Sequence, residues 1–299
     1  MKELSCFADK YYKNLTESII PFWQGHSLDT QYGGYFTCLE RNGSIYDTKK
    51  YIWLQGRAIW MFSQLYNELE KKQEFLDAAK LGIDFIDKYA FDNKGRPYFC
   101  LTREGKPYFF QRKPYGAVFC MLGYLEYARA TGQQQYHRKA EELFARISAW
   151  IEDTRLLDRP VLSGLPQCSN LANVMVLASM AIELAKFDRK PEYIDLIQQT
   201  IKNTQLHYDC NRRILIENVS LDDTSLESSP EGRLFNPGHS IEVAWFLLHL
   251  LEFIPDKKME KLALDALEGS LEYHAESYFH RNIQSDYCVH AHRTLGCRT

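Results

Sequence analysis

The stretch Tyr98-Phe99-Cys100-Leu101-Thr102-Arg103-Glu104-Gly105 repeats an earlier one, Tyr35-Phe36-Thr37-Cys38-Leu39-Glu40-Arg41-Asn42-Gly43, with Cys, Leu, Arg and Gly in register. Each copy alternates in polarity and ends in a glycine turn, Asn-Gly in the earlier copy and Glu-Gly in the later one. This pattern predicts two β-hairpins. A weaker third copy is expected at Ile214-Leu215-Ile216-Glu217-Asn218-Val219-Ser220.

Helical periodicity fills most of the remaining chain. Apolar residues recur at intervals of three and four, as in Phe7, Tyr11, Leu15 and Ile19. The pattern predicts helices over residues 7–19, 52–70, 75–89, 118–130, 143–151, 171–185, 193–204, 241–253 and 259–271. Short connections between neighbouring helices favour antiparallel pairs. We therefore expect an all-α fold, an α/α toroid with the small β-hairpins on one mouth.

Composition and charge exclude several classes of function. The chain has 299 residues, of which 45% are hydrophobic and 25% charged, as in globular proteins with a sizeable core. Its 36 Lys and Arg against 39 Asp and Glu give a net charge of -3, without a basic block for nucleic acid or an anionic membrane. The sequence opens without an apolar signal core, and its longest apolar stretch, 244–254, is too short to span a bilayer. We expect a cytoplasmic protein with neither nucleic-acid nor membrane partners.

Cysteine and aromatic residues give weaker indications. The eight cysteines are scattered without a CxxC pair, so we expect reduced and mostly buried thiols. Cys288, His290, His292 and Cys297 could chelate zinc, but chance placement is the more economical interpretation, and no metal is expected. Aromatic residues make up 14% of the chain, which suits a sugar-binding cleft, although composition alone favours a helical core.

The first candidate segment, residues 46–57, leads from a predicted hairpin into a helix. Trp53 and Arg57 lie one helical turn apart, so both side chains can face one cavity. Arg57 is followed by Ala58-Ile59-Trp60, an apolar setting in which a guanidinium needs a carboxylate partner or an anionic ligand. A structural salt bridge and a ligand site both fit this sequence.

The second candidate segment is residues 231–245, in which Asn236-Pro237-Gly238 forms a turn and His239 begins an apolar helix. Glu242 and Trp245 follow on the same helical face. The helix N-terminus favours a neutral imidazole, and a nearby carboxylate has the opposite effect. This arrangement favours a general base, against the alternative of a structural histidine.

Both segments, together with Gly33-Gly34-Tyr35-Phe36-Thr37-Cys38-Leu39 and Leu157-Asp158-Arg159-Pro160, resemble the N-acylglucosamine 2-epimerase family, which has cellobiose 2-epimerases as relatives. The resemblance runs in order from about residue 5 to about residue 272. It implies an (α/α)6 barrel that epimerises a sugar at C2, chiefly N-acetylglucosamine to N-acetylmannosamine. It implies no cofactor, although a nucleotide regulates some relatives.

The resemblance also implies residue roles. His239 would be one of two acid/base histidines flanking C2, and Arg57 would hold the oxygens of the enediolate. The substrate pocket would be lined by Trp53, Tyr115, Glu231, Arg233, Asn236, Glu242 and Trp245. For Glu231 and Arg233, a salt bridge that only ties their loop is the alternative. At Tyr115-Gly116-Ala117-Val118 relatives usually carry Ser and an acidic residue before the apolar run, so the sugar preference stays open.

The C-terminal part departs from the family pattern. The family's second catalytic histidine and a glutamate have no counterpart, and residues 273–299 lack helical period. We expect one toroid domain over residues 1–272, incomplete at about nine of twelve helices, followed by a disordered or frame-shifted tail over residues 273–299. An open ring would expose apolar helix flanks, which favours a homodimer.

The leading functional prediction is a C2 epimerase of amino sugars, with the activity of this exact chain left open by the missing residues. One alternative is a neutral-sugar epimerase or aldose-ketose isomerase of the same fold. Another is a non-catalytic sugar- or protein-binding member. A glycosidase needs two carboxylates flanking the scissile bond, and the combination of Arg57 with His239 argues against it.

Overall fold

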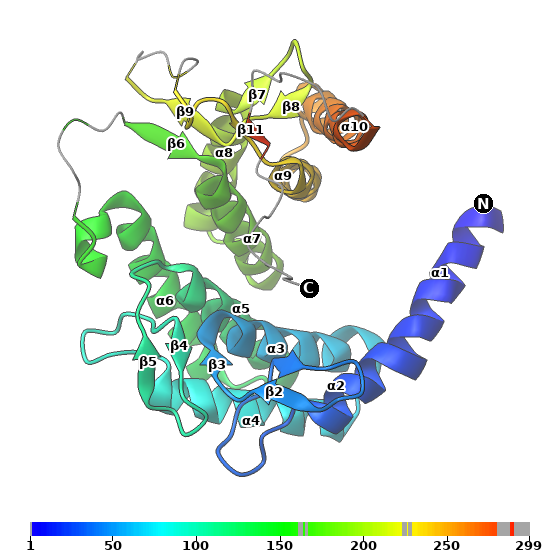
Figure 1. The fold of residues 1–299 in the computed structure, drawn as a ribbon, viewed down its shortest axis with the longest axis vertical. Helices are drawn as coiled ribbons and strands as arrows, with labels where there is room; N and C mark the ends of the chain where they lie inside the picture. Colours follow the sequence, from blue (N-terminus) through cyan, green and yellow to red (C-terminus); the bar gives the residue numbers. More distant parts are fainter. Residues whose placement is uncertain are drawn as a thin grey trace. The chain divides into compact units, whose positions relative to one another are not determined.

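The structure is a computed structural model that describes residues 2–160, 164, 167–222, 226, 229–279 and 288–289. Contacts divide the chain into two compact units, Met1–Val161 and Leu162–Thr299. Figure 1 shows that helices dominate both units and that short strands lie between helices along the chain.

The helices match the predicted periodicity. In the first unit they are α1 (Lys2–Asn14), α2 (Ile20–His26), α3 (Ile52–Gln64), α4 (Gln73–Tyr89), α5 (Tyr115–Thr131) and α6 (Gln134–Glu152). In the second unit they are α7 (Leu171–Phe187), α8 (Pro191–Leu206), α9 (Pro237–Leu250) and α10 (Lys257–Phe279). A π-helical segment, Leu15–Ile19, joins α1 to α2 in one continuous helix, and a second one, Leu65–Leu69, extends α3. Every predicted helix is therefore confirmed.

Helix packing follows one scheme in both units. In the first unit, α3 packs against α5, and α4 and α6 pack against α3 and α5 respectively. In the second unit, α7 packs against α9, with α8 and α10 as their partners. The helices α5 and α7 are apolar on nearly all sides, whereas α4 and α6 bury one face. Each unit thus pairs an inner helix with an outer one, as an α/α toroid requires.

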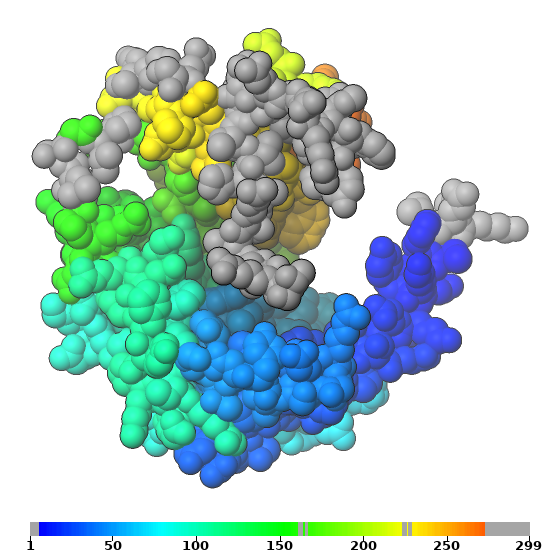
Figure 2. Space-filling model, in the orientation of Figure 1, coloured from blue at the N-terminus to red at the C-terminus, as the bar shows by residue number. Residues whose placement is uncertain are grey.

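The first unit carries the two predicted hairpins. Strands β1 (Cys38–Leu39) and β2 (Ile45–Asp47) pair antiparallel. Strands β3 (Lys50–Tyr51), β4 (Cys100–Leu101) and β5 (Pro107–Phe109) form an antiparallel sheet of three strands. The turn glycines Gly43 and Gly105 have φ of 86° and 87°, a conformation that L side chains rarely adopt. Both hairpin predictions are confirmed, and the blue and blue-green segments that carry them adjoin in Figure 2.

The third predicted copy differs from the other two. Strand β8 (Ile214–Leu215) pairs with β7 (Tyr208–Asp209), and β9 (Asn218–Ser220) pairs with β6 (Cys168–Asn170). The stretch from 214 to 220 contains no glycine that could make a tight turn, and the chain turns earlier, where Arg213 has a φ of 56°. As a result, Ile216 and Glu217 form a link between two separate strand pairs.

Most of the predicted tail lies outside the described residues. Helix α10 continues to Phe279, and β10 (Leu234–Phe235) pairs in parallel with β11 (Cys288–Val289). His290, His292 and Cys297 lie outside the described residues, so the zinc alternative is untested. The domain boundary at residue 272 stays a prediction.

Candidate active site

Arg57 lies on α3 with its guanidinium against two aromatic rings. Its Cζ is 4.7 Å from the ring centroid of Phe119 and 5.8 Å from that of Trp53. The two rings are themselves 5.9 Å apart. Within the described residues, Arg57 forms no ion pair, so the structural salt bridge considered above is not observed there. A cation held by ring faces keeps its N–H groups available for an oxyanion.

Close contact between α3 and α5 creates this arrangement. A Cβ on Gly56 would lie 2.4 Å from the carbonyl carbon of Phe119, so only glycine lets the two backbones approach this far. Phe119 lies one turn after Tyr115, which begins α5, so both side chains are on the same helical side. The fold therefore brings Trp53, Arg57, Tyr115 and Phe119 to one side of the α3–α5 pair.

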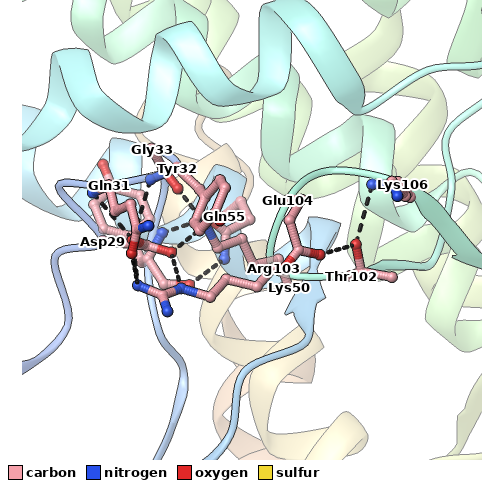
Figure 3. A network of polar contacts seen from close by, with 11 residues as sticks. Asp29, Gln31, Tyr32, Gly33, Lys50, Gln55, Thr102, Arg103, Glu104 and Lys106 are labelled. Atoms are coloured by element: carbon pink, nitrogen blue, oxygen red, sulfur yellow. Dashed lines mark hydrogen bonds and ion pairs between the residues drawn. The ribbon is translucent and has the colours of Figure 1, made fainter.

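A buried ionic network holds the chain just before α3. The side chains of Lys50 and Asp29 have no exposed surface, and Lys50 Nζ lies 2.9 Å from Asp29 Oδ2. Arg103 Nε also donates to Asp29 Oδ2, at 2.9 Å. Figure 3 shows Lys50 and Arg103 converging on this carboxylate from two hairpin segments. In the same region Gln55 exchanges two hydrogen bonds with the backbone of Tyr35, so its amide is structural.

Opposing effects set the pKa values of the two buried groups in this network. Burial, the largest single effect, raises the pKa of Asp29, but hydrogen bonds from Arg103 and Lys50 together lower that pKa to about 2. Burial also lowers the pKa of Lys50, against the opposing effect of Asp29. Removing Asp29 would leave the buried ammonium of Lys50 without its carboxylate partner.

His239 occupies the first turn of α9. Asn236 caps this helix, because its Oδ1 accepts from the backbone N–H groups of Gly238 and His239 at 3.1 and 3.4 Å. The Nδ1 atom of His239 lies 3.0 Å from Oε2 of Glu217, whose side chain is 7% exposed. The hydrogen bond to this carboxylate raises the pKa of His239, and burial opposes the shift.

The sequence reasoning missed Glu217 as the partner of His239. It indicated Glu242 because of helical spacing, but the direct contact comes from the link between β8 and β9, and Glu242 adds only a smaller electrostatic effect on the pKa of His239. Apolar residues before Glu217 showed a strand in the sequence, but not which way its carboxylate would point. Since Nδ1 faces Glu217, Nε2 is the nitrogen of His239 that remains for a substrate.

Three other predicted site residues of this unit, Trp245, Glu231 and Arg233, are exposed. Trp245 is exposed on α9, with its ring 4.6 Å from that of His249. Glu231 and Arg233 are exposed, and no ion pair joins them in the part of the chain that the structure describes. The backbone carbonyl of Glu231 accepts from Asn218 Nδ2 at 3.0 Å. Their contact with a sugar stays a prediction, as does the convergence of Arg57 and His239.

A metal site is absent from the part of the chain that is described, since no three His, Cys, Asp or Glu side chains gather there in a way that could hold an ion. Within the same residues, no helix has the length and apolar character needed to cross a membrane. Within the described residues no disulfide is formed by Cys6, Cys38, Cys100, Cys120, Cys168 or Cys210. Only Cys100 and Cys120 among them are buried, so the prediction of mostly buried thiols is wrong.

The family model and the curated relatives point to one family. The pattern of the family described as N-acylglucosamine 2-epimerase (GlcNAc 2-epimerase) matches residues 34–277. The rat N-acylglucosamine 2-epimerase is 36% identical over 256 residues, which cover 83% of this chain and 61% of that protein. The bovine N-acylglucosamine 2-epimerase is 35% identical over 269 residues, covering 88% and 63% respectively. This chain therefore spans less than two thirds of the length of these relatives.

A solved structure gives the fold. The cellobiose 2-epimerase of Bacillus thermoamylovorans matches with a TM-score of 0.75 at 20% identity, over 89% of this chain and 72% of that one. At this identity the likeness concerns architecture alone. It confirms the predicted (α/α)6-type toroid, of which this chain forms part.

Proposed function

Since this chain belongs to the N-acylglucosamine 2-epimerase family, we propose that it carries the proton-transfer chemistry of a sugar 2-epimerase, with N-acetylglucosamine and N-acetylmannosamine as substrates. The observation that carries the proposal is the contact between His239 Nδ1 and the buried carboxylate of Glu217. An imidazole held in this way presents Nε2 as a base of fixed orientation.

The proposed step begins with Nε2 of His239 taking the proton from C2 of the open-chain sugar. The imidazolium that forms is stabilised by Glu217, because its Nδ1–H donates to that carboxylate. Electrons from the C–H bond move onto the carbonyl oxygen, and the guanidinium of Arg57 stabilises the enediolate. Return of a proton to C2 completes exchange on one face, whereas inversion needs a donor on the opposite face.

Substrate contacts belong to the same proposal. Trp53, Tyr115 and Trp245 would stack on apolar faces of the sugar. Glu242, Glu231, Arg233 and Asn236 would bind hydroxyl or amide groups, with Asn236 using its Nδ2 because its Oδ1 caps α9. A homodimer and a cytoplasmic location also remain proposals, the latter supported by the lack of disulfides among the cysteines of the described chain.

Isotope exchange tests this function directly. The protein is incubated in deuterated water with N-acetylglucosamine, and deuterium at C2 is measured by NMR or mass spectrometry. We expect label at C2, whether or not the epimer accumulates. Exchange into cellobiose or glucose but not N-acetylglucosamine would support a neutral-sugar enzyme. Sugar binding without any exchange would support a non-catalytic member of the family.

A further inference from the structure

A second histidine of the same unit, His207, is fully buried and contacts Ile216, the residue before Glu217. It follows α8, its exposed fraction is 0%, and both of its ring nitrogens have partners. Nδ1 lies 2.8 Å from the carbonyl oxygen of Ile216, and Nε2 lies 2.9 Å from Oγ of Ser169. The proton-transfer scheme above makes no use of this side chain.

The partners of His207 fix its tautomer. A carbonyl oxygen can only accept, so Nδ1 must carry the hydrogen. In the neutral ring Nε2 is then the acceptor for the Ser169 hydroxyl. Burial lowers the pKa of His207 and favours this neutral form, although Ile216 and the charge of Glu217 act in the opposite direction.

The contacts of His207 immobilise the residue next to Glu217. The backbone N–H of Ile216 donates to the carbonyl oxygen of His207 at 2.9 Å, while the ring of His207 binds the carbonyl of Ile216. Both polar groups of the Ile216 backbone are therefore held by one residue. Ser169 lies in β6, so the ring also connects this link to the sheet β6–β9.

The backbone of Glu217 is held just as firmly. Its N–H donates to the carbonyl oxygen of Leu234 at 3.1 Å, and its carbonyl accepts from the N–H of Leu171 at 2.8 Å. The backbone of Glu217 is thus held through its N–H and its carbonyl, and its side chain, which is 7% exposed, contacts Nδ1 of His239. The bonds of His207 to Ile216 anchor the preceding residue, and their loss would loosen the N-terminal side of Glu217.

We propose that His207 is a positioning residue, which holds Ile216 so that the carboxylate of Glu217 stays on Nδ1 of His239. The inference rests on the proposed function for its catalytic consequence, but its structural part concerns only the contact between Glu217 and His239. His207 does not itself reach a substrate. It determines which nitrogen of His239 is free to act.

Two substitutions distinguish the hydrogen bond of His207 Nδ1 from that of Nε2. In His207→Gln the amide reaches the Nε2 position, so the link to Ser169 can persist while the donor to Ile216 is lost. In His207→Asn the amide nitrogen lies near the Nδ1 position, so the donor to Ile216 can persist. Thr204→Val is the matched stability control, because Thr204 is buried on the last turn of α8 and its hydroxyl donates to the carbonyl of Thr200 within that helix, at 2.9 Å. The substitution leaves the backbone carbonyl of Thr204, which accepts from the N–H of His207, in place.

The main measurement is the 15N NMR titration of the His239 imidazole, which needs no activity. For His207→Gln we expect the pKa of His239 to fall toward its ordinary value and the proton at Nδ1 to become less favoured. His207→Asn should restore the titration of the unsubstituted protein, and Thr204→Val should not change it. In the exchange assay, kcat of His207→Gln should fall about tenfold with little change in KM.

Several outcomes would overturn the inference. One is a His207→Gln protein that unfolds more easily but keeps the His239 titration of the unsubstituted protein. If His207→Gln does not fold, His207→Asn decides the question, since the inference requires a normal His239 titration in that variant. Loss of that titration in His207→Asn, with Thr204→Val normal, would refute it. If no protein exchanges C2 hydrogen, the proposed function fails, but the NMR result still decides the role of His207.

Discussion

The two units support their key side chains by opposite means. In the first unit, Lys50, Asp29 and Arg103 form an ionic network that does not include Arg57. Arg57 instead packs against aromatic rings and forms no ion pair in the described chain. In the second unit the carboxylate of Glu217 contacts His239, the proposed base, directly. The groups behind Glu217 are neutral, as the hydrogen bonds of His207 and Ser169 illustrate.

This difference suits the two chemical roles proposed for Arg57 and His239. A guanidinium binds an oxyanion less tightly when a carboxylate already pairs with it, so contact with aromatic rings suits Arg57 better than an ion pair. A base that becomes positively charged gains from a buried carboxylate, and a neutral second layer leaves that carboxylate free to act on it. The comparison predicts that substitutions in the ionic network of the first unit will lower stability, whereas substitutions of Arg57 and His239 will lower activity.

The largest expected effect is that of His239→Ala on deuterium exchange at C2. Loss of a general base typically costs about 10²–10⁴-fold in rate, and a positioned base should be at the upper end. The matched control is His249→Ala, also on α9, where Nδ1 lies 3.0 Å from Glu252, at a carboxylate that is 68% exposed. We expect the control to exchange normally. Equal rates in the two variants would remove His239 from the mechanism.

The next largest effect is on stability, in the first unit. Asp29→Asn would leave Lys50 buried without its carboxylate, and breaking such a pair typically costs about 3–5 kcal/mol of unfolding free energy. Chemical denaturation measures the loss. Asp84→Asn is the control, because its pair with Lys80 is exposed and typically contributes about 1 kcal/mol or less.

A second variant sharpens this prediction. Lys50 Nζ lies 4.5 Å from the ring centroid of Phe85, so a methionine at position 50 would meet an apolar neighbour. Combining Asp29→Asn with Lys50→Met should therefore recover part of the lost unfolding free energy. If the double variant is no more stable than Asp29→Asn alone, the unpaired lysine charge is not the cause of the loss.

A smaller effect on rate, without a comparable loss of stability, is expected for Arg57→Met. Removing one group that stabilises an oxyanion typically costs about 10²–10³-fold in kcat. Unfolding free energy should change little, because Arg57 is exposed and forms no ion pair within the described residues. Arg103→Met provides the contrast, since it should lower stability through Asp29 and leave exchange largely intact. The opposite pattern would reverse the assignment of the two arginines.

The same contrast shows how far sequence reasoning reaches. Helices and both glycine-turn hairpins were predictable, because periodicity and turn chemistry are local properties of the chain. The pairing of Trp53 with Arg57 was predictable for the same reason, since they share one helix face. Phe119 beneath Arg57 and Glu217 beside His239 were not predictable, because each comes from a distant segment and depends on how elements pack. Local spacing favoured Glu242 instead, which has only the weaker effect on His239.

The smallest predicted effect is a pH dependence of stability that Glu217→Gln should weaken. Glu217 raises the pKa of His239, so the pair stabilises the fold below the ordinary histidine pKa of 6.5, and this contribution is lost as pH rises through the higher pKa of the folded state. His207, whose pKa is lowered, affects stability only below 6.5, so the two windows do not overlap. Denaturation curves between about pH 6 and 9 should therefore show unfolding free energy falling with pH in the unsubstituted protein, and a weaker fall in Glu217→Gln. Parallel curves for the two proteins would mean that the Glu217 contact does not bias the charge of His239 in solution.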